Sequence, residues 1–139
     1  MQAKATLLTL VDTEFGYLGL AQVAKKGDDA FAIRYLASFL DRMRCDEVRL
    51  RYDNENSMVQ LAEKVRAFRS PRKTTLEPIV RAEHEMVGAV ERAHRTLQAS
   101  VRALVFDYRA RTTSTLLPGD VLFSWLVRHA AWCLRRFQP

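Results

Sequence analysis

The order of hydrophobic and polar residues predicts that the chain begins with two strands. Residues 5–12 and 17–24 are rich in Leu, Val, Thr and Tyr, and residues 13–16 between them have the composition of a turn. β-Branched and aromatic side chains favour extended backbone, and a short polar segment that contains glycine favours reversal of the chain. The two segments therefore predict a β-hairpin.

The middle of the chain predicts a helix followed by another strand. Residues 28–44 form an apolar stripe at helical spacing, and the carboxylates of Asp28 and Asp29 suit the positive end of a helix dipole. Residues 48–53 alternate apolar and polar positions, which is strand periodicity, and this strand ends on Asp53. The same reasoning then predicts a helix over 57–69, an extended segment over 74–79 and a polar loop over 80–87.

Two helices are predicted to close the chain. Apolar residues recur at 3.6-residue spacing over about 89–110, and Asp120 caps a last helix that reaches about residue 136. This last helix is apolar on most faces, so we expect it to be largely buried, with Trp125 and Trp132 as core residues or as a dimer face. Strands interleaved with helices predict one α/β domain over residues 1–139, a mixed sheet flanked by helices.

Composition and charge narrow the class of protein. A hydrophobic content of 48% suffices for a real core in a chain of 139 residues. The net charge of +6 favours an anionic partner, either nucleic acid or an anionic membrane surface, and charge alone does not choose between them.

Cysteines and apolar segments point to a soluble intracellular protein without membrane association. Cys45 and Cys133 stand far apart without metal-ligand spacing, which argues against a disulfide framework and a structural zinc site and predicts a reducing compartment. The apolar run before Asp12 is too short for a signal peptide, and the apolar stretch 121–134 is interrupted by Arg128 and His129.

Two carboxylates carry the candidate chemistry. Asp53 ends a predicted strand, where open α/β sheets place their ligand sites, and Glu91 lies in the first turn of a predicted helix. Converging carboxylates stay ionised together only when a cation neutralises them, and oxygen ligands select Mg²⁺ or Mn²⁺. A metal pair could then act on a phosphodiester. The alternatives are an Asx turn at Asp53, and a helix-dipole carboxylate or an ion pair with Arg95 at Glu91.

Four segments of the chain resemble one family. MVGAVERAHRTLQASVRAL (residues 86–104) resembles the glutamate helix of integrases from retroviruses and long-terminal-repeat retrotransposons, and RYDNENS (51–57) resembles their second-aspartate strand and its turn. Asp53 and Glu91 enclose 37 residues, close to the spacing of the family's Asp-Asp-Glu pattern. LVDTEFGYL (10–18) resembles the family's early hairpin, and SWLVRHAA (124–131) resembles its closing helix.

The resemblance implies both a fold and an activity. The fold is the ribonuclease H-like fold, and the activity is that of a polynucleotidyl transferase that uses Mg²⁺ (or Mn²⁺) to process DNA 3′ ends and transfer strands. Asp53 and Glu91 would be the catalytic metal ligands, and Arg95, Gln98 and Arg102, on the same helical stripe, would contact DNA. The alternative for this stripe is an ordinary solvated face. The chain would act as a homo-oligomer, in the nucleus if it comes from a eukaryotic retroelement.

The family also requires a first aspartate, carried on the first strand of its sheet. Asp12 is the only early candidate, but its neighbours match the turn of the following hairpin, and only 40 residues separate it from Asp53. We therefore expect that the chain is N-terminally truncated, that the first strand lies upstream, and that Asp12 is a turn residue. Catalysis by this chain alone would then fail. The alternative function is an inactive remnant that acts only as a nucleic-acid-binding or oligomerisation module.

Overall fold

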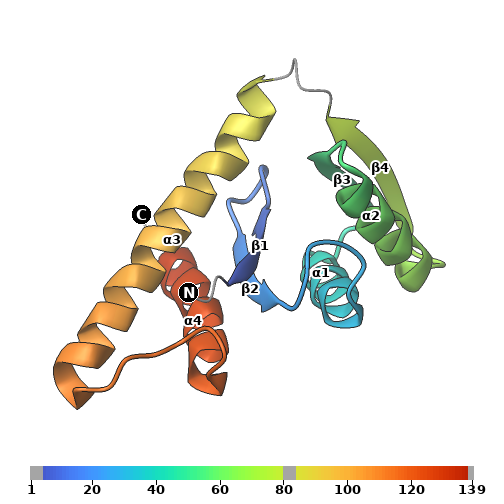
Figure 1. The fold of residues 1–139 in the computed structure, drawn as a ribbon. Helices are drawn as coiled ribbons and strands as arrows, with labels where there is room; N and C mark the ends of the chain where they lie inside the picture. Colours follow the sequence, from blue (N-terminus) through green and yellow to red (C-terminus); the bar gives the residue numbers. More distant parts are fainter. Residues whose placement is uncertain (1–4, 80–83, 138–139) are drawn as a thin grey trace. The chain divides into compact units, whose positions relative to one another are not determined.

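The computed structural model describes residues 5–79 and 84–137. Strands and helices interleave along the chain, which confirms the α/β class (Figure 1). The elements are β1 (Thr6–Val11), β2 (Leu18–Val23), α1 (Ala30–Arg42), β3 (Glu47–Asp53), α2 (Asn56–Arg69), β4 (Lys73–Ile79), α3 (His84–Thr112) and α4 (Val121–Phe137).

Contacts along the chain divide it into two compact units. Unit 1 comprises Met1–Gln22 and Gly88–Pro139, and unit 2 comprises Val23–Val87. That residues 1–139 form one domain stays a prediction. None of the helices within 5–79 and 84–137 has the length and apolar content needed to cross a membrane.

Unit 1 contains the predicted β-hairpin, in which β1 and β2 pair as a two-stranded sheet. The Asp12 N–H donates to the Tyr17 carbonyl oxygen at 2.8 Å, and the Gly16 N–H donates to the Asp12 carbonyl oxygen at 2.9 Å. Gly16 adopts a φ of 75°, a left-handed conformation that glycine reaches without steric cost. The hairpin prediction is therefore confirmed.

The core of unit 1 is apolar throughout. Leu20 of β2, Leu97 of α3 and Val127 of α4 are fully buried together. Covering a side chain of this size stabilises the fold by about 1.5–3 kcal/mol. The other buried members of this cluster are Val101, Leu116, Phe123, Leu126, Ala130 and Ala131.

Helix α4 is buried on one face only, so the prediction that it is largely buried is wrong. Trp125 is 58% exposed and Trp132 is 48% exposed, which excludes them from the core. The physical reason is that α4 has apolar side chains around more of its circumference than its neighbours in the unit cover.

Helix α3 begins earlier than predicted. Its first residue is His84, so the predicted loop is wrong for residues 84–87, while residues 80–83 lie outside the described part of the chain. The predicted loop ended just before Gly88. A glycine inside a helix costs only about 1 kcal/mol, which a 29-residue helix tolerates.

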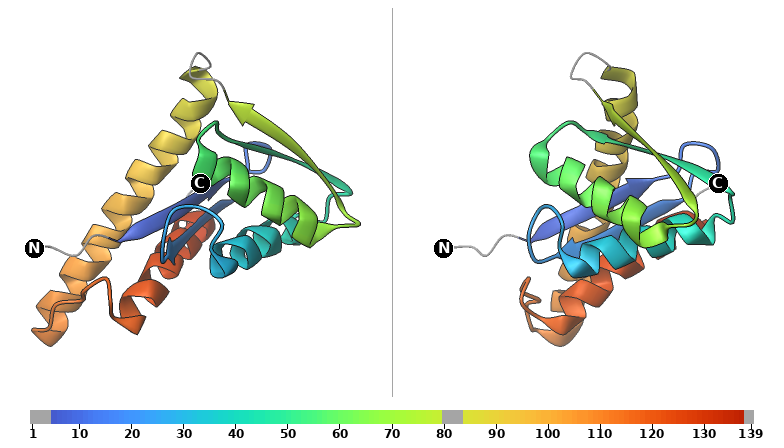
Figure 2. Two further views of the ribbon diagram at one scale, coloured as in Figure 1. Left: turned by 45° about the vertical axis from the view of Figure 1, so that its right-hand side comes forward. Right: turned by 90° about the vertical axis from the view of Figure 1, so that its right-hand side faces the viewer.

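Unit 2 is built on a parallel pair of strands. β3 and β4 run side by side, with Glu47 opposite Lys73 and Asp53 opposite Ile79. Helix α2 packs against both strands and against α1 (Figure 2). The buried apolar residues of this unit include Leu36, Leu40, Val48, Tyr52, Leu61, Val65 and Ile79.

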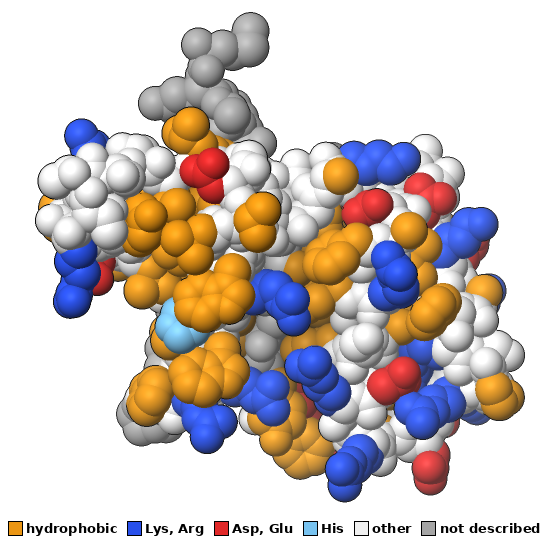
Figure 3. Space-filling model, turned by 90° about the horizontal axis from the view of Figure 1, so that it is seen from below, with side chains coloured by type: hydrophobic (Ala, Val, Ile, Leu, Met, Phe, Trp, Pro, Cys, Tyr) orange, Lys and Arg blue, Asp and Glu red, His pale blue; other side chains and the backbone are white. Residues whose placement is uncertain are grey.

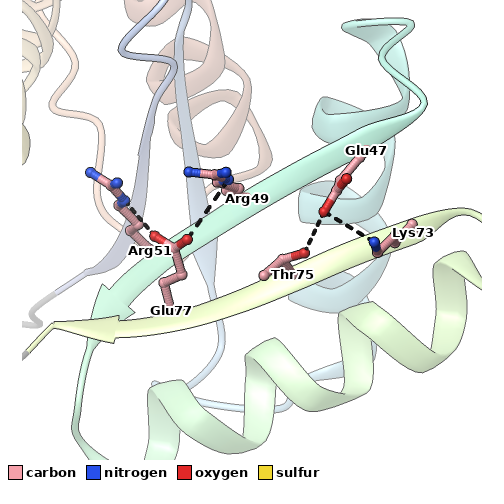
Figure 4. A network of polar contacts seen from close by, with 6 residues as sticks. All are labelled: Glu47, Arg49, Arg51, Lys73, Thr75 and Glu77. Carbon is pink, nitrogen blue, oxygen red and sulfur yellow. Dashed lines mark hydrogen bonds and ion pairs between the residues drawn. The ribbon is translucent and has the colours of Figure 1, made fainter.

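The opposite face of the β3–β4 pair carries charged side chains (Figure 4). Glu77 of β4 pairs with Arg51 at 2.8 Å and lies 3.8 Å from Arg49. Glu47 pairs with Lys73 at 3.5 Å and accepts a hydrogen bond from the Thr75 hydroxyl at 2.8 Å. These cross-strand contacts hold the two strands together on the exposed side.

Candidate functional site

Asp53 lies where the strand pattern predicted it, at the last position of β3. Its side chain is exposed. The Glu55 N–H donates to the Asp53 carbonyl oxygen at 2.7 Å, and this tight turn leads directly into α2 at Asn56. Because β3 and β4 are parallel, the carboxyl ends of both strands meet at the edge that carries Asp53.

The neighbours of Asp53 in the sequence have structural roles. Tyr52 is buried, and this burial, with the carboxylate of Glu63 as a smaller cause, raises the pKa of its phenol, so the ring stays neutral beneath the strand end. Glu55 pairs with Lys26 at 2.5 Å, with both side chains about half exposed. Glu55 is therefore engaged in an ion pair with a lysine.

Glu91 lies on α3, but not in its first turn as predicted. It is the eighth residue of the helix, two turns from the start, because the helix continues through Gly88. Its side chain is exposed. The helix-dipole interpretation of Glu91 is therefore wrong, since dipole effects fall off within the first turn.

The stripe of α3 that follows Glu91 is polar and open to solvent. Arg95 and Arg102 are exposed, and Gln98 is half-buried. Within the described part of α3, an ion pair joins Arg111 to Asp107 at 3.0 Å, whereas Glu91 and Arg95 do not pair. The stripe thus presents a carboxylate and two guanidinium groups that are not committed to one another.

His94 anchors this stripe to the hairpin. It follows Glu91 by one turn, and its Nδ1 shares a hydrogen bond with the Thr9 hydroxyl of β1. This contact gives His94 a structural role. Because the bond joins α3 to β1, it fixes the rotation of the helix within unit 1.

Asp12 is a turn residue, as expected. Its carboxylate accepts hydrogen bonds from the Glu14 N–H at 3.0 Å and from the Phe15 N–H at 3.1 Å. Both oxygens therefore stabilise the turn of the hairpin, which is an Asx-type arrangement. A metal ion on Asp12 would have to compete with these two bonds.

Arg69 has a structural role that no pattern in the sequence predicted. It is the last residue of α2, and its side chain is only 1% exposed. The Arg69 Nε donates to the Asp41 carboxylate at 3.0 Å, and its Nη1 bonds the Thr74 hydroxyl. Arg72 also pairs with Asp41, at 3.1 Å. No local pattern revealed these contacts, because Asp41 lies 28 residues away in the sequence.

The structure thus assembles the candidate residues in two groups. Glu91, Arg95, Gln98 and Arg102 belong to unit 1, and Asp53 belongs to unit 2. Over residues 5–79 and 84–137, no group of three or more His, Cys, Asp or Glu side chains could hold a metal ion. A two-carboxylate site formed by Asp53 and Glu91 therefore belongs to the proposal below.

Comparisons with known proteins identify the fold. No family model and no curated protein matches the chain. The catalytic core domain of BIV integrase is similar in structure, with a TM-score of 0.65 and 16% identity over 99% of this chain and 80% of that one. The HTLV-2 integrase catalytic core, solved with magnesium in a trimeric form, gives a TM-score of 0.62 and 14% identity over the same shares.

These likenesses confirm the predicted fold. The chain has the ribonuclease H-like fold of integrase catalytic core domains, with its described strands paired as two two-stranded sheets. Identities of 16% and 14% carry the likeness of fold, and the activity is a proposal.

Proposed function

We propose that this chain is the core of an integrase-type polynucleotidyl transferase, which processes DNA 3′ ends and transfers strands. One observation carries the proposal. On the fold of an integrase core, Asp53 ends a parallel strand and Glu91 lies on the long helix, and both carboxylates are exposed. Neither forms an ion pair with another described residue.

The chemistry of these two donors fits a hard divalent cation. Carboxylate oxygens are the ligands that Mg²⁺ and Mn²⁺ prefer, and exposed carboxylates without an ion pair can coordinate without first losing a partner. The HTLV-2 neighbour was solved with magnesium. When bound by Asp53 and Glu91, such an ion would polarise a phosphodiester and activate the attacking oxygen.

The remaining polar residues of the α3 stripe would position the DNA. Arg95, one turn beyond Glu91, and Arg102, two turns beyond Arg95, are exposed cations suited to phosphate oxygens. Gln98 between them offers an amide. Phosphate contacts place a duplex without reading its sequence, so we expect binding with low sequence specificity and strong salt dependence.

We also propose that the chain acts as a homo-oligomer, as the trimeric form of the HTLV-2 neighbour suggests. The cellular location would be the nucleus if the chain comes from a eukaryotic retroelement. A second candidate function is a non-catalytic nucleic-acid-binding or oligomerisation module. The engagement of Asp12 in its turn favours this candidate, because it leaves the proposed site with two carboxylates.

Strand transfer with short duplex DNA ends in Mg²⁺ tests the proposal. The proposal requires strand transfer by the unmodified chain, contrary to the expectation from the sequence that this chain alone is inactive, and the reduction of that activity to background in Glu91→Gln and in Asp53→Asn. Glu55→Gln is the matched control, because Glu55 is paired with Lys26, and it should retain activity. Activity that survives Glu91→Gln would contradict the assigned role. Salt-sensitive DNA binding by a chain that never cleaves would support the module.

A further inference from the structure

The exposed face of α4 holds an ordered stack of aromatic rings. His129 lies between Trp125 and Trp132, with ring centroids 4.8 and 5.6 Å away and interplanar angles of 11° and 17°. Figure 3 shows a histidine enclosed by hydrophobic side chains on this face of the molecule. Because an indole covers each face of the imidazole, the His129 ring is held in one orientation.

This orientation directs one nitrogen of His129 at a thiol. The His129 Nε2 lies 3.3 Å from the Cys133 Sγ, one turn along the helix, and Cys133 is a free, half-buried cysteine. Zinc binds imidazole nitrogen at about 2.0–2.1 Å and thiolate sulfur at about 2.3 Å, which in a tetrahedral site puts the two ligand atoms about 3.5 Å apart. The two side chains are therefore already spaced as neighbouring zinc ligands, which departs from the expectation, drawn from the sequence, that Cys133 has no metal-ligand spacing.

We propose that His129 and Cys133 form half of a zinc site, which the same pair from a second copy of the chain completes. A closed zinc site requires four ligands, and the described residues of one chain offer no third His, Cys, Asp or Glu beside this pair. A second copy supplies an identical pair by a symmetric contact, which gives two imidazoles and two thiolates around one ion.

The charges on α4 favour two thiolates over one. The helix carries Arg128, Arg135 and Arg136 and no carboxylate, and the Arg136 guanidinium lies 5.0 Å from the Trp132 ring centroid. One thiolate would leave a zinc ion with a net positive charge on a helix that already carries three arginines. Two thiolates neutralise the ion, so binding by two copies avoids this repulsion.

The surface around the pair suits burial against a second copy. Apart from the half-exposed tryptophans, Val121 is 88% exposed and Phe137 is 74% exposed at the two ends of α4. Apolar side chains gathered in this way mark interaction surfaces, and a metal held by two copies would cover them. The zinc site is independent of the strand-transfer activity, because it uses none of the residues assigned to that activity.

Zinc titration of the full, metal-free chain near neutral pH tests the inference. We expect the molecular mass to double as zinc is added, with one ion bound for every two chains. The chain has two tryptophans, and both flank His129, so their emission should shift in the same titration. Cobalt as a probe should give a thiolate-to-metal absorption band.

Variants of the two proposed ligands show whether zinc binds at His129 and Cys133 or at another place on the chain. Cys133→Ser and His129→Gln should each weaken zinc-dependent dimerisation at least tenfold, with an unchanged circular dichroism spectrum. Cys45→Ser is the matched control, because Cys45 is the other cysteine and is exposed, and it should behave as the unmodified chain does.

Three outcomes would overturn the inference. If zinc binds and the molecular mass does not change, the site does not involve a second copy of the chain. If zinc-dependent dimerisation persists in Cys133→Ser, the contact or the metal lies elsewhere. If the tryptophan emission of the unmodified chain does not change when zinc is added, that result alone contradicts the proposed site. None of these measurements uses DNA, so a failure here is distinct from a failure of the strand-transfer assay.

Discussion

The two units of this protein bury different kinds of side chain. In unit 1, the residues that seal the core are apolar, with Leu20, Leu97 and Val127 fully covered. In unit 2, an arginine is buried beside the apolar core, where Arg69 bonds Asp41 and Thr74. The hydrophobic pattern of the sequence therefore describes the interior of unit 1 well, but it misses a charged contact inside unit 2.

The largest effect should come from the core of unit 1. Leu97→Ala removes a fully buried side chain from α3 and leaves a cavity in the core, so we expect a loss of about 3 kcal/mol in the free energy of unfolding. Denaturant titration followed by tryptophan emission reports on this unit, because both tryptophans lie on α4.

Leu117→Ala provides the control for this change. Leu117 belongs to the same unit but is 59% exposed, so the same truncation should change stability by less than about 0.5 kcal/mol. Equal losses from the two variants would show that the core of unit 1 does not depend on Leu97.

A smaller loss should follow from removing the buried charge of unit 2. Arg69→Ala takes one partner from Asp41 and leaves the Thr74 hydroxyl buried without its bond, which should cost about 1–3 kcal/mol. The loss should stay within this range, because Asp41 is 40% exposed and keeps Arg72 as a partner. Denaturant titration followed by circular dichroism measures the loss.

Two further variants sharpen the interpretation of Arg69. Arg66→Ala removes an exposed arginine from the same helix and should have little effect on stability. Arg69→Met keeps much of the buried volume without the charge. If Arg69→Met were as stable as the unmodified chain, packing and not the ion pair would explain the burial of Arg69.

Local sequence patterns predicted where the strands and helices lie better than they predicted which of their faces are buried. Strand alternation placed Asp53 at the end of β3, and turn chemistry identified the hairpin, because both signals lie within a few neighbouring residues. The exposure of Trp125 and Trp132 could not be predicted in this way. Which side of a helix is covered depends on its neighbours in space, and helical spacing alone does not contain that information.

The candidate site shows the same difference between features that neighbouring residues predict and features that depend on tertiary packing. The turn role of Asp12 follows from its neighbours, and the structure confirms it through two backbone hydrogen bonds. The position of Glu91 within α3 was wrong, because a single glycine was given more weight than the length of the helix justified. The spacing between Asp53 and Glu91 is a property of the sequence, whereas the meeting of two carboxylates depends on tertiary packing.

The smallest predicted effect concerns the charged face of β3 and β4. The pKa of Glu47 is lowered from 4.5, first by the hydrogen bond from the Thr75 hydroxyl and then by the positive charge of Lys73. A lowered pKa in the folded state means that the ionised carboxylate stabilises the fold above pH 4.5. This contribution is lost as the pH falls through the lower folded-state value.

Thr75→Val should therefore raise the pKa of Glu47 toward 4.5, which a titration of its side-chain carboxyl signal by NMR measures directly. The part of the stability difference that comes from this bond should be present at about pH 6 and should be lost as the pH falls through the folded-state pKa of Glu47, whereas any change in strand propensity or packing should not depend on pH. Glu47→Gln provides the control, since the effect of Thr75→Val on stability should not depend on pH in that background.

A constant difference would contradict this prediction. If the stability difference between the unmodified chain and Thr75→Val does not change with pH, the hydroxyl does not stabilise the ionised carboxylate. Because the group is fully exposed, the effect should also shrink as salt is added, which distinguishes this surface contact from the buried pair at Arg69.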